Sequence, residues 1–427
     1  MIYNLANINR GDTMSGYLTK IKTKIPRTDK EVDIDVNGKT LIFTGGNGCG
    51  KTQLLSSIYN KLIDRVADRN NNEIQQLKQN ISHYKQYIER DGPAHRSYDS
   101  WVNQKEDMEK QVEELENPSI ELSDLEHFIL KYKDFQAVLL QFEAGRKSDI
   151  LKPSSVVPID SLRDKDQKTV SNRHQKTTTS SVFEEFLVTS IANQAFSESK
   201  KINNNPQEAA RIDKWFTKLE TDLQNLFEDN ELELVFKSDS LSFELHQPNK
   251  EPYTFQTLSS GFSSIMAVYA DLITKVSLRS IDPEELTGIV MIDEIDAHLH
   301  VSLQKKILSF LTEAFPKVQF IVTTHSPFVV SSVKDAVIYD LSKLEQVEDL
   351  SMYSYEAVLE GLFGVLPISS LLQQNIEELA KLLEIHPIDL EKIKSILNEL
   401  PQSEEDLDAE SLYFVNSAKI VINKARG

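Results

Sequence analysis

The 427-residue chain has a single cysteine, Cys49, and no long apolar run. One cysteine cannot close a disulfide within the chain, and no run approaches the roughly 18 apolar residues needed to span a bilayer. Residues 1–12 also lack the apolar core of a secretory signal. We therefore expect a soluble, cytoplasmic protein that contacts no membrane.

Positive charge is also scarce. The chain has 47 Lys and Arg against 66 Asp and Glu, which gives a formal net charge of -19. Because this net charge repels phosphate backbones, broad coating of DNA is disfavoured, although local basic patches are not. At about 150 residues per domain, the length allows two or three domains or one large α/β domain with insertions.

Patterning predicts the order of elements. Alternating apolar residues predict strands at 17–25, 32–36 and 40–43, with a hairpin turn at Asn37-Gly38 between the last two. A glycine-rich loop and a helix with a 3.6-residue period follow. Further strands are expected within 232–255, around Asp239-Ser240, and helices from Ser354 to the end.

Two heptad-like arms predict a helical hairpin at 67–118. The first arm has a seam of Ile74, Leu77, Ile81, Tyr84 and Ile88, and the second one of Trp101, Lys105, Met108, Val112 and Leu115. Two ordinary core helices are the alternative, but the many charges between seam positions favour a projecting pair. Residues 146–181 are rich in Ser, Thr, Lys and Asp, so we expect a flexible insertion there.

A phosphate-binding loop is the clearest motif. It fits G-x-x-x-x-G-K-[ST] and lies between a strand and a helix, where backbone N–H groups, the helix terminus and a lysine all attract phosphate. We expect it to bind ATP, with the Thr52 hydroxyl on Mg²⁺ and Cys49 as a small filler. The loop consists of Gly45, Gly46, Asn47, Gly48, Cys49, Gly50, Lys51 and Thr52.

Two more apolar runs end in polar groups. The run at 288–292 ends in Asp293 and Glu294, for which we expect Mg²⁺ binding and general-base catalysis, respectively. The run at 320–324 ends in His325, a candidate sensor of the terminal phosphate. A structural histidine is the alternative for His325.

A second anion site is predicted at Ser259, Ser260 and Gly261, which open a helix. Since one nucleotide already has its phosphate loop, this helix end is expected to face the nucleotide of a second copy. An ordinary helix cap is the alternative.

Together these residues resemble the ABC-type ATPases. Gly45 to Thr52 correspond to Walker A, Leu258 to Phe262 to the signature, Asp293-Glu294 to Walker B with the catalytic glutamate, and His325 to the switch histidine. The resemblance covers most of residues 17–341. It implies a head-to-tail homodimer, or a higher homo-oligomer, in which each signature completes the partner's site.

The sequences at 293–300 and 324–327, and the inserted hairpin, resemble the SMC, RecF and OLD-like branch. Two residues depart from the family pattern: Phe262 at the end of the signature and His300 at the end of the D-loop. A Q-loop glutamine is implied, with Gln141 as the candidate and Arg146 as its rival.

The fold class implied is α/β: a P-loop head with an antiparallel β lobe, a parallel-sheet core, a coiled-coil hairpin and a helical C-terminal region. The resemblance divides the chain into 1–66, the first part of the head; 67–118, the hairpin; 119–345, the rest of the head; and 346–427, the helical region.

No acidic Asp-x-Asp pair of the Toprim nuclease type is evident after His325, so this chain is expected to cut nothing itself. It resembles the stand-alone ATPases of anti-phage systems, the PARIS type first and the Septu and retron-associated types second. The resemblance implies a regulatory ATPase that controls a separate nuclease effector and senses a phage-encoded protein.

The alternative is a RecF-like clamp that grips DNA during repair through hairpin lysines 78, 85, 105 and 110. Those lysines alternate with glutamates, which favours an ordinary solvated face. A transporter ATP-binding subunit is a third possibility, disfavoured by the branch-specific motifs and the hairpin.

Overall fold

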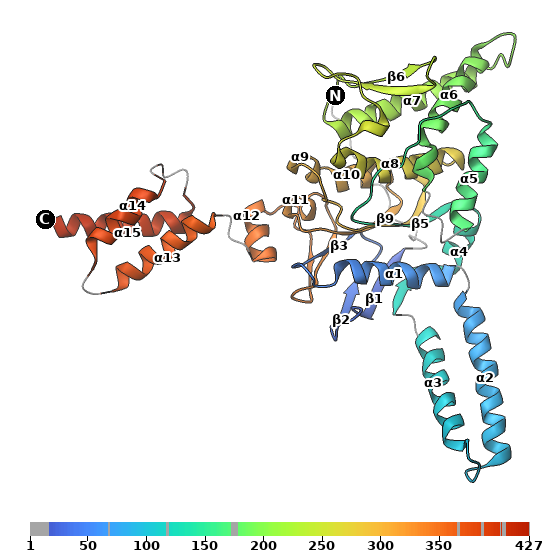
Figure 1. The fold of residues 1–427 in the computed structure, drawn as a ribbon, viewed down its shortest axis with the longest axis horizontal. Coiled ribbons are helices and arrows are strands. Elements are labelled where there is room, and N and C mark those ends of the chain that lie inside the picture. Colours follow the sequence, from blue (N-terminus) through green and yellow to red (C-terminus); the bar gives the residue numbers. More distant parts are fainter. Residues whose placement is uncertain are drawn as a thin grey trace, which may run out of the picture. The chain divides into compact units, whose positions relative to one another are not determined.

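The computed structural model describes residues 17–66, 69–116, 119–171, 178–364, 368–385, 388–401, 403 and 407–426. It divides into two compact units, Met1–Tyr353 and Ser354–Gly427 (Figure 1). The first unit contains the sheets and the helical hairpin, and the second contains helices.

A six-stranded sheet with the order β11-β10-β3-β9-β8-β5 forms the centre of the first unit. Every pairing from β10 to β5 is parallel, and only the edge strand β11 runs antiparallel to its neighbour. All parallel strands therefore present their carboxyl ends at one edge. The strands are β3 (Leu41–Thr44), β5 (Ala137–Phe142), β8 (Thr287–Ile292), β9 (Val318–Thr323), β10 (Val337–Asp340) and β11 (Glu345–Glu348).

A smaller antiparallel sheet has the order β2-β1-β4, with β1 (Leu18–Lys24), β2 (Glu31–Asp35) and β4 (Ile120–Leu122). Its apolar face shares one core with α1 (Lys51–Val66) and the larger sheet. Leu54 and Ile58 of α1 are fully buried in this core, which fixes the helix that follows the phosphate loop.

The hairpin expected at Asn37-Gly38 is wrong. Both residues have positive φ (52° and 73°), as the turn motif requires, but β2 pairs with β1 while β3 enters the larger sheet. The reason lies in β3, all four of whose residues are buried. A strand buried on both faces belongs inside a parallel sheet rather than at the edge of a hairpin.

The remaining helices of the first unit lie around the sheets (Figure 1). The expected strands around Asp239-Ser240 are confirmed as an antiparallel pair, β6 (Glu233–Lys237) and β7 (Ser242–His246). The helices are α4 (Leu125–Lys133), α5 (Ile159–Ser171), α6 (Phe183–Glu198), α7 (Pro206–Phe227), α8 (Ser260–Leu278), α9 (Val301–Gln304), α10 (Ile307–Ala314) and α11 (Pro327–Val330), with short turns η1 (Thr179–Val182), η2 (Phe255–Thr257) and η3 (Pro283–Glu285).

The helical hairpin is confirmed as α2 (Arg69–Asp91) and α3 (Tyr98–Glu116). Tyr87 of α2 packs against Trp101 of α3, while Lys85 pairs with Glu109 further along α3, so the two helices run antiparallel. Along the described part of α2, the predicted seam is buried or half-buried and the residues between its positions are exposed. This pattern matches a two-helix seam rather than two core helices.

The insertion at 146–181 differs from the flexible segment that we expected. Residues 159–171 form α5, in which Leu162 and Asp166 are buried. Asp166 pairs at 3.0 Å with Lys275, in the C-terminal part of α8, and at 2.7 Å with Arg279, the residue directly after that helix. A buried charge cluster, together with the buried side chain of Leu162, thus anchors α5. Residues 172–177 lie outside the described residues.

The second unit is helical, as expected, with α12 (Tyr355–Val358), η4 (Leu359–Phe363), α13 (Ser370–Glu384), α14 (Leu390–Glu399) and α15 (Ala409–Arg426). Its last three helices share a core that includes Leu379, Ile393 and Ala418, all fully buried. The unit begins later than the expected 346, because residues 345–348 form β11 of the larger sheet.

Candidate functional site

The phosphate loop leaves the carboxyl end of β3 and enters α1. Gly45, Gly48 and Gly50 have φ angles of 127°, 76° and 99°, which L-residues with side chains rarely adopt. A Cβ on Gly45 would lie 2.8 Å from the Ser342 hydroxyl oxygen. Glycine is therefore required here both by the backbone conformation and by the neighbouring side chain.

Lys51 is buried beneath this loop. Its ammonium nitrogen donates to the carbonyl oxygens of Gly45 (2.9 Å) and Gly46 (3.1 Å). The full positive charge thus lies inside the curve of the loop, at the start of α1, where a helix N-terminus adds partial positive charge. Thr52, also in the first turn of α1, is exposed. The loop fits a polyphosphate, and the Thr52 hydroxyl is available to a bound Mg²⁺ ion.

Ser342 supports the loop and was missed by the sequence analysis. Its hydroxyl accepts a hydrogen bond from the backbone N–H of Gly46 at 2.8 Å, and its own N–H donates to the Asp340 carboxylate at 2.8 Å. The sequence does contain a pattern that could have identified Ser342, since Val337–Asp340 is another buried strand that is followed by polar residues. β10 lies beside β3 in the sheet, which brings Ser342 to the loop.

The two carboxylates after β8 have different surroundings. Asp293 is buried and accepts a hydrogen bond from the Thr323 hydroxyl at 2.6 Å. Glu294 is half-buried, has a φ of 44°, and donates its N–H to the same hydroxyl at 2.7 Å. Thr323, the last residue of β9, therefore orders both acids. The sequence pattern pointed to His325, two residues later, rather than to Thr323.

His325 lies among the charges of this site. Burial is the main cause that lowers its pKa, and the nearby Lys51 lowers it further. Asp296, Glu294 and Asp293 act in the opposite direction, but burial outweighs them. The imidazole therefore favours its neutral form. Because β3 and β8 both pair in parallel with β9, the carboxyl strand ends that precede the phosphate loop, the acid pair and His325 lie side by side.

The Q-loop candidates lie at and after the carboxyl end of β5. The Gln141 amide donates to the Ser56 hydroxyl of α1 at 2.9 Å, one turn beyond Thr52. Its rival, Arg146, donates to backbone carbonyls of the segment 293–295 instead. The two residues thus contact different parts of the site.

The signature residues open α8. Ser259 and Ser260 are exposed, and the Ser259 side chain makes no capping hydrogen bond. Gly261 lies against the turn after Glu294, because a Cβ there would be 2.8 Å from the His298 carbonyl oxygen. Contact between these serines and the nucleotide of a second copy stays a prediction.

Both departures from the family pattern have local partners. Phe262 stacks on Phe227 of α7, with ring centroids 4.2 Å apart and planes 6° apart. His300 caps α9, since its side chain accepts from the N–H of Ser302. Each residue therefore stabilises the packing around the signature and the D-loop.

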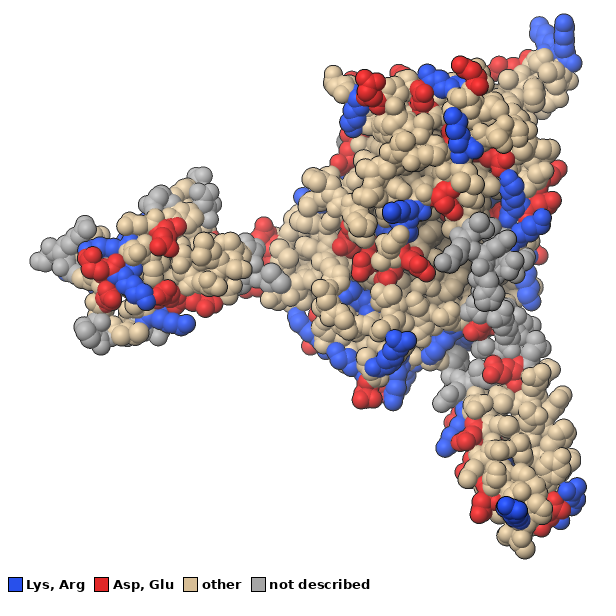
Figure 2. All heavy atoms as spheres, in the orientation of Figure 1, with Lys and Arg blue, Asp and Glu red and all other residues tan. Residues whose placement is uncertain are grey.

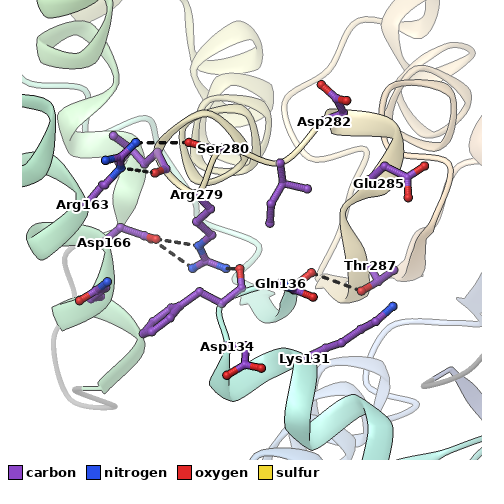
Figure 3. A pocket seen from close by; sticks show the side chains of 14 residues that line it. Lys131, Asp134, Gln136, Arg163, Asp166, Arg279, Ser280, Asp282, Glu285 and Thr287 are labelled. Atoms are coloured by element: carbon purple, nitrogen blue, oxygen red, sulfur yellow. Dashed lines mark hydrogen bonds and ion pairs between the residues drawn. The ribbon is translucent and has the colours of Figure 1, made fainter.

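A cavity of about 640 Å³ lies away from the phosphate loop (Figure 3). It includes Gln136 and Thr287, which stand at the amino ends of β5 and β8, whereas the phosphate loop follows a carboxyl end. Figure 3 shows Arg279 bonded to Asp166 and Arg163 bonded to Ser280 in its wall. The cavity thus borders the charge cluster that anchors α5.

Among the described residues, no helix is both long and apolar enough to cross a membrane. The described part of the chain also contains no group of three or more His, Cys, Asp or Glu side chains that could hold a metal ion.

A parallel sheet with a phosphate loop after β3, an acid pair after β8 and a histidine after β9 defines an α/β P-loop ATPase head of the ABC type. The hairpin is its insertion and the helical unit its C-terminal region. Residues 95–331 match the family described as "AAA domain, putative AbiEii toxin, Type IV TA system". This match covers more than half of the chain, and the chain belongs to that family.

Two relatives bear on the resemblance to the ATPases of anti-phage systems. The chain is 40% identical over 114 residues to "Retron Ec83 probable ATPase" of Escherichia coli, a match covering 25% of this chain and 21% of that one. It is 33% identical over 151 residues to "Septu protein PtuA" of Bacillus thuringiensis, covering 34% and 37%. The resemblance to retron and Septu ATPases is confirmed, and the PARIS type stays a prediction. Each match spans well under half of the relative's length.

Among solved structures, the chain is similar to the "Crystal structure of the SmcHead bound to the C-winged helix domain of ScpA". The TM-score is 0.36 at 14% identity, and the match covers 77% of this chain and 96% of the other.

Proposed function

We propose that this protein is an ATP-hydrolysing regulatory subunit of an anti-phage defence system. In this proposal it forms a head-to-tail dimer or a higher oligomer and controls a separate nuclease effector. A phage-encoded protein is the trigger. The family supports the ATPase class, and the Septu and retron names of its relatives support the defence role.

One observation carries the ATPase part of the proposal: Lys51, Asp293, Glu294 and His325 follow the carboxyl ends of three adjacent parallel strands. Bound ATP with Mg²⁺ supplies the scissile phosphoanhydride bond and the cation that neutralises its charge. Thr52 and Asp293 are the expected metal ligands.

Each of the other groups has a distinct task in this proposal. Lys51 places positive charge on the phosphates. Glu294 orients a water molecule and accepts its proton, because its carboxylate is the more accessible of the two acids. His325, favoured in its neutral form, can donate one hydrogen bond to a phosphate oxygen without needing to be charged.

Control of a separate effector is the finer part of the proposal. We expect the chain, expressed together with the product of a neighbouring nuclease gene, to form a complex whose stability changes when ATP and Mg²⁺ are added. Co-purification followed by light scattering measures both composition and mass. Failure to associate, with or without ATP, would remove the effector-control role and leave the ATPase assignment standing.

Ion pairs on the hairpin weigh against the DNA-clamp alternative. Lys85 and Lys105 both pair with Glu109, at 3.4 and 3.1 Å. Figure 2 shows basic and acidic side chains intermingled on the visible face of the hairpin. A basic strip that binds phosphates would need these lysines to leave their carboxylate partners.

A further inference from the structure

Arg146 contacts the backbone of residues 293–295, which include the acid pair, but it has no role in the proposed reaction. It lies in the loop that follows β5, where its backbone N–H donates to the Glu143 carbonyl oxygen at 3.2 Å. The loop turns back there, and the side chain reaches the carboxyl end of the neighbouring strand, β8.

The guanidinium binds three successive carbonyl groups. One terminal nitrogen donates to the Asp293 oxygen at 2.7 Å, the other donates to the Ile295 oxygen at 3.1 Å, and both lie 3.4 Å from the Glu294 oxygen. A planar fork of N–H donors can span several acceptors in this way, whereas a lysine ammonium is a single point. The contact thus depends on the shape of arginine as well as on its charge.

The same backbone segment is held from its other side by β9. The N–H of Glu294 donates to the Thr323 hydroxyl at 2.7 Å, and the N–H of Ile295 donates to the Thr323 carbonyl oxygen at 3.0 Å. Between the two sets of bonds, Glu294 is held at a φ of 44°, which is uncommon for a residue with a side chain. A catalytic carboxylate is thus attached to a backbone fixed on both sides.

The Arg146 side chain is largely removed from solvent and lies near the carboxylates of Asp296, Asp293 and Glu294. Burial lowers the pKa of Arg146 to about 10, although Asp296, Asp293 and Glu294 oppose this shift, so the side chain stays charged at neutral pH. Its Nε atom is buried and has no hydrogen-bond partner among the described residues. The terminal nitrogens alone therefore make the contacts to 293–295.

We propose that Arg146 is a positioning residue of the ATPase site: its guanidinium clamps the carbonyl groups of 293–295 and thereby aims the Glu294 carboxylate. This inference rests on the proposed function, because it assigns Glu294 as the base. Gln141 instead contacts Ser56 of α1, on the phosphate-loop side of the site.

The test compares Arg146→Ala, Arg146→Lys and the control Lys147→Ala in the full-length chain. Lys147 is the exposed neighbour in the same loop, so its substitution removes equal charge without touching the clamp. For each protein, steady-state ATP turnover, affinity for a fluorescent ATP analogue and thermal unfolding are measured. A misaimed base costs about 100-fold in rate, so Arg146→Ala should lose about that much kcat while its analogue affinity stays within about threefold.

Arg146→Lys should stay close to the alanine variant, since it retains charge but not the fork, and Lys147→Ala should match wild type. Wild-type-like turnover in Arg146→Lys would overturn the proposal, and it decides the matter even if Arg146→Ala does not fold. Equal losses of kcat and nucleotide affinity would also overturn it, because they indicate a general structural role. No turnover in the wild-type chain would instead count against the proposed function.

Discussion

Asp293 and Glu294 are neighbours in the chain but differ in environment. The buried Asp293 carboxylate accepts from Thr323, whereas Glu294 is half-buried and has left-handed backbone dihedral angles. A fixed, buried acid suits a metal ion, and a more accessible one suits a water molecule that must reach the phosphate. The difference supports the two roles that we propose for them.

Two substitutions separate nucleotide binding from chemistry. Lys51→Ala removes the charge inside the loop and should abolish binding of ATP. Glu294→Gln keeps the loop and the metal ligands, so it should bind ATP normally while turnover falls by about 10² to 10⁴. Equilibrium binding and phosphate release measure the two quantities on the same samples. Unchanged affinity in Lys51→Ala, or unchanged turnover in Glu294→Gln, would refute that residue's assignment.

The sequence was sufficient for residues whose type and spacing are tied to phosphate chemistry. Gly45 to Thr52, Asp293, Glu294 and His325 each follow a buried strand, and parallel strands bring their ends together. Ser342 also follows a buried strand, but its contact with the phosphate loop, like the roles of Thr323 and Arg146, could not be assigned in the same way. Their partners lie far away in the sequence, so their roles depend on the order of strands in the sheet rather than on local pattern.

At the scale of elements, α8 connects the signature to the charge cluster that borders the cavity of Figure 3. Its first turn carries Ser260 and Gly261, and its last turns carry Lys275, which pairs with Asp166 of α5. The heptad pattern predicted the hairpin, and the start of α8 was expected from the Ser259-Ser260-Gly261 motif. Neither pattern predicted α5, because that helix is anchored by a buried aspartate in a segment with few apolar residues.

Asp166→Asn should destabilise the head. Burial alone would raise the pKa of Asp166, but Lys275 and Arg279 outweigh it, so the pKa lies below its ordinary value of 3.8. The ionised form then stabilises the fold above pH 3.8, and this contribution is lost as pH falls through the lowered value. Leaving two buried cations without this partner typically costs about 3 to 5 kcal/mol at neutral pH.

Denaturant unfolding of Asp166→Asn and of Asp160→Asn provides the comparison. Asp160 is also on α5 and also pairs with an arginine, Arg163, but its side chain is 86% exposed. The control should therefore change stability by under about 1 kcal/mol. The difference in free energy of unfolding between wild type and Asp166→Asn should become smaller as pH falls below 3.8, the ordinary pKa of an aspartate. Equal effects of the two substitutions at neutral pH would contradict the anchoring role.

At the scale of the molecule, the chain carries a phosphate loop and a separate helix terminus that also suits an anion. Ser259 and Ser260 are exposed, and Gly261 abuts the D-loop turn. A second copy placed head to tail would bring these serines to the phosphates held by the first. In such a dimer each site is formed by residues of both copies, and the two sites are related by the two-fold axis of an isologous interface.

The sole cysteine of the chain, Cys49, allows a direct test, because it lies in the phosphate loop. Ser260→Cys in a Glu294→Gln background adds one thiol to the signature of a protein that retains ATP. A short bismaleimide should then give a covalent dimer on a denaturing gel when ATP and Mg²⁺ are present. The Cys49→Ser version should give none. If the ATP-saturated protein yields no more dimer than the parent with Cys49 alone, the shared site is contradicted.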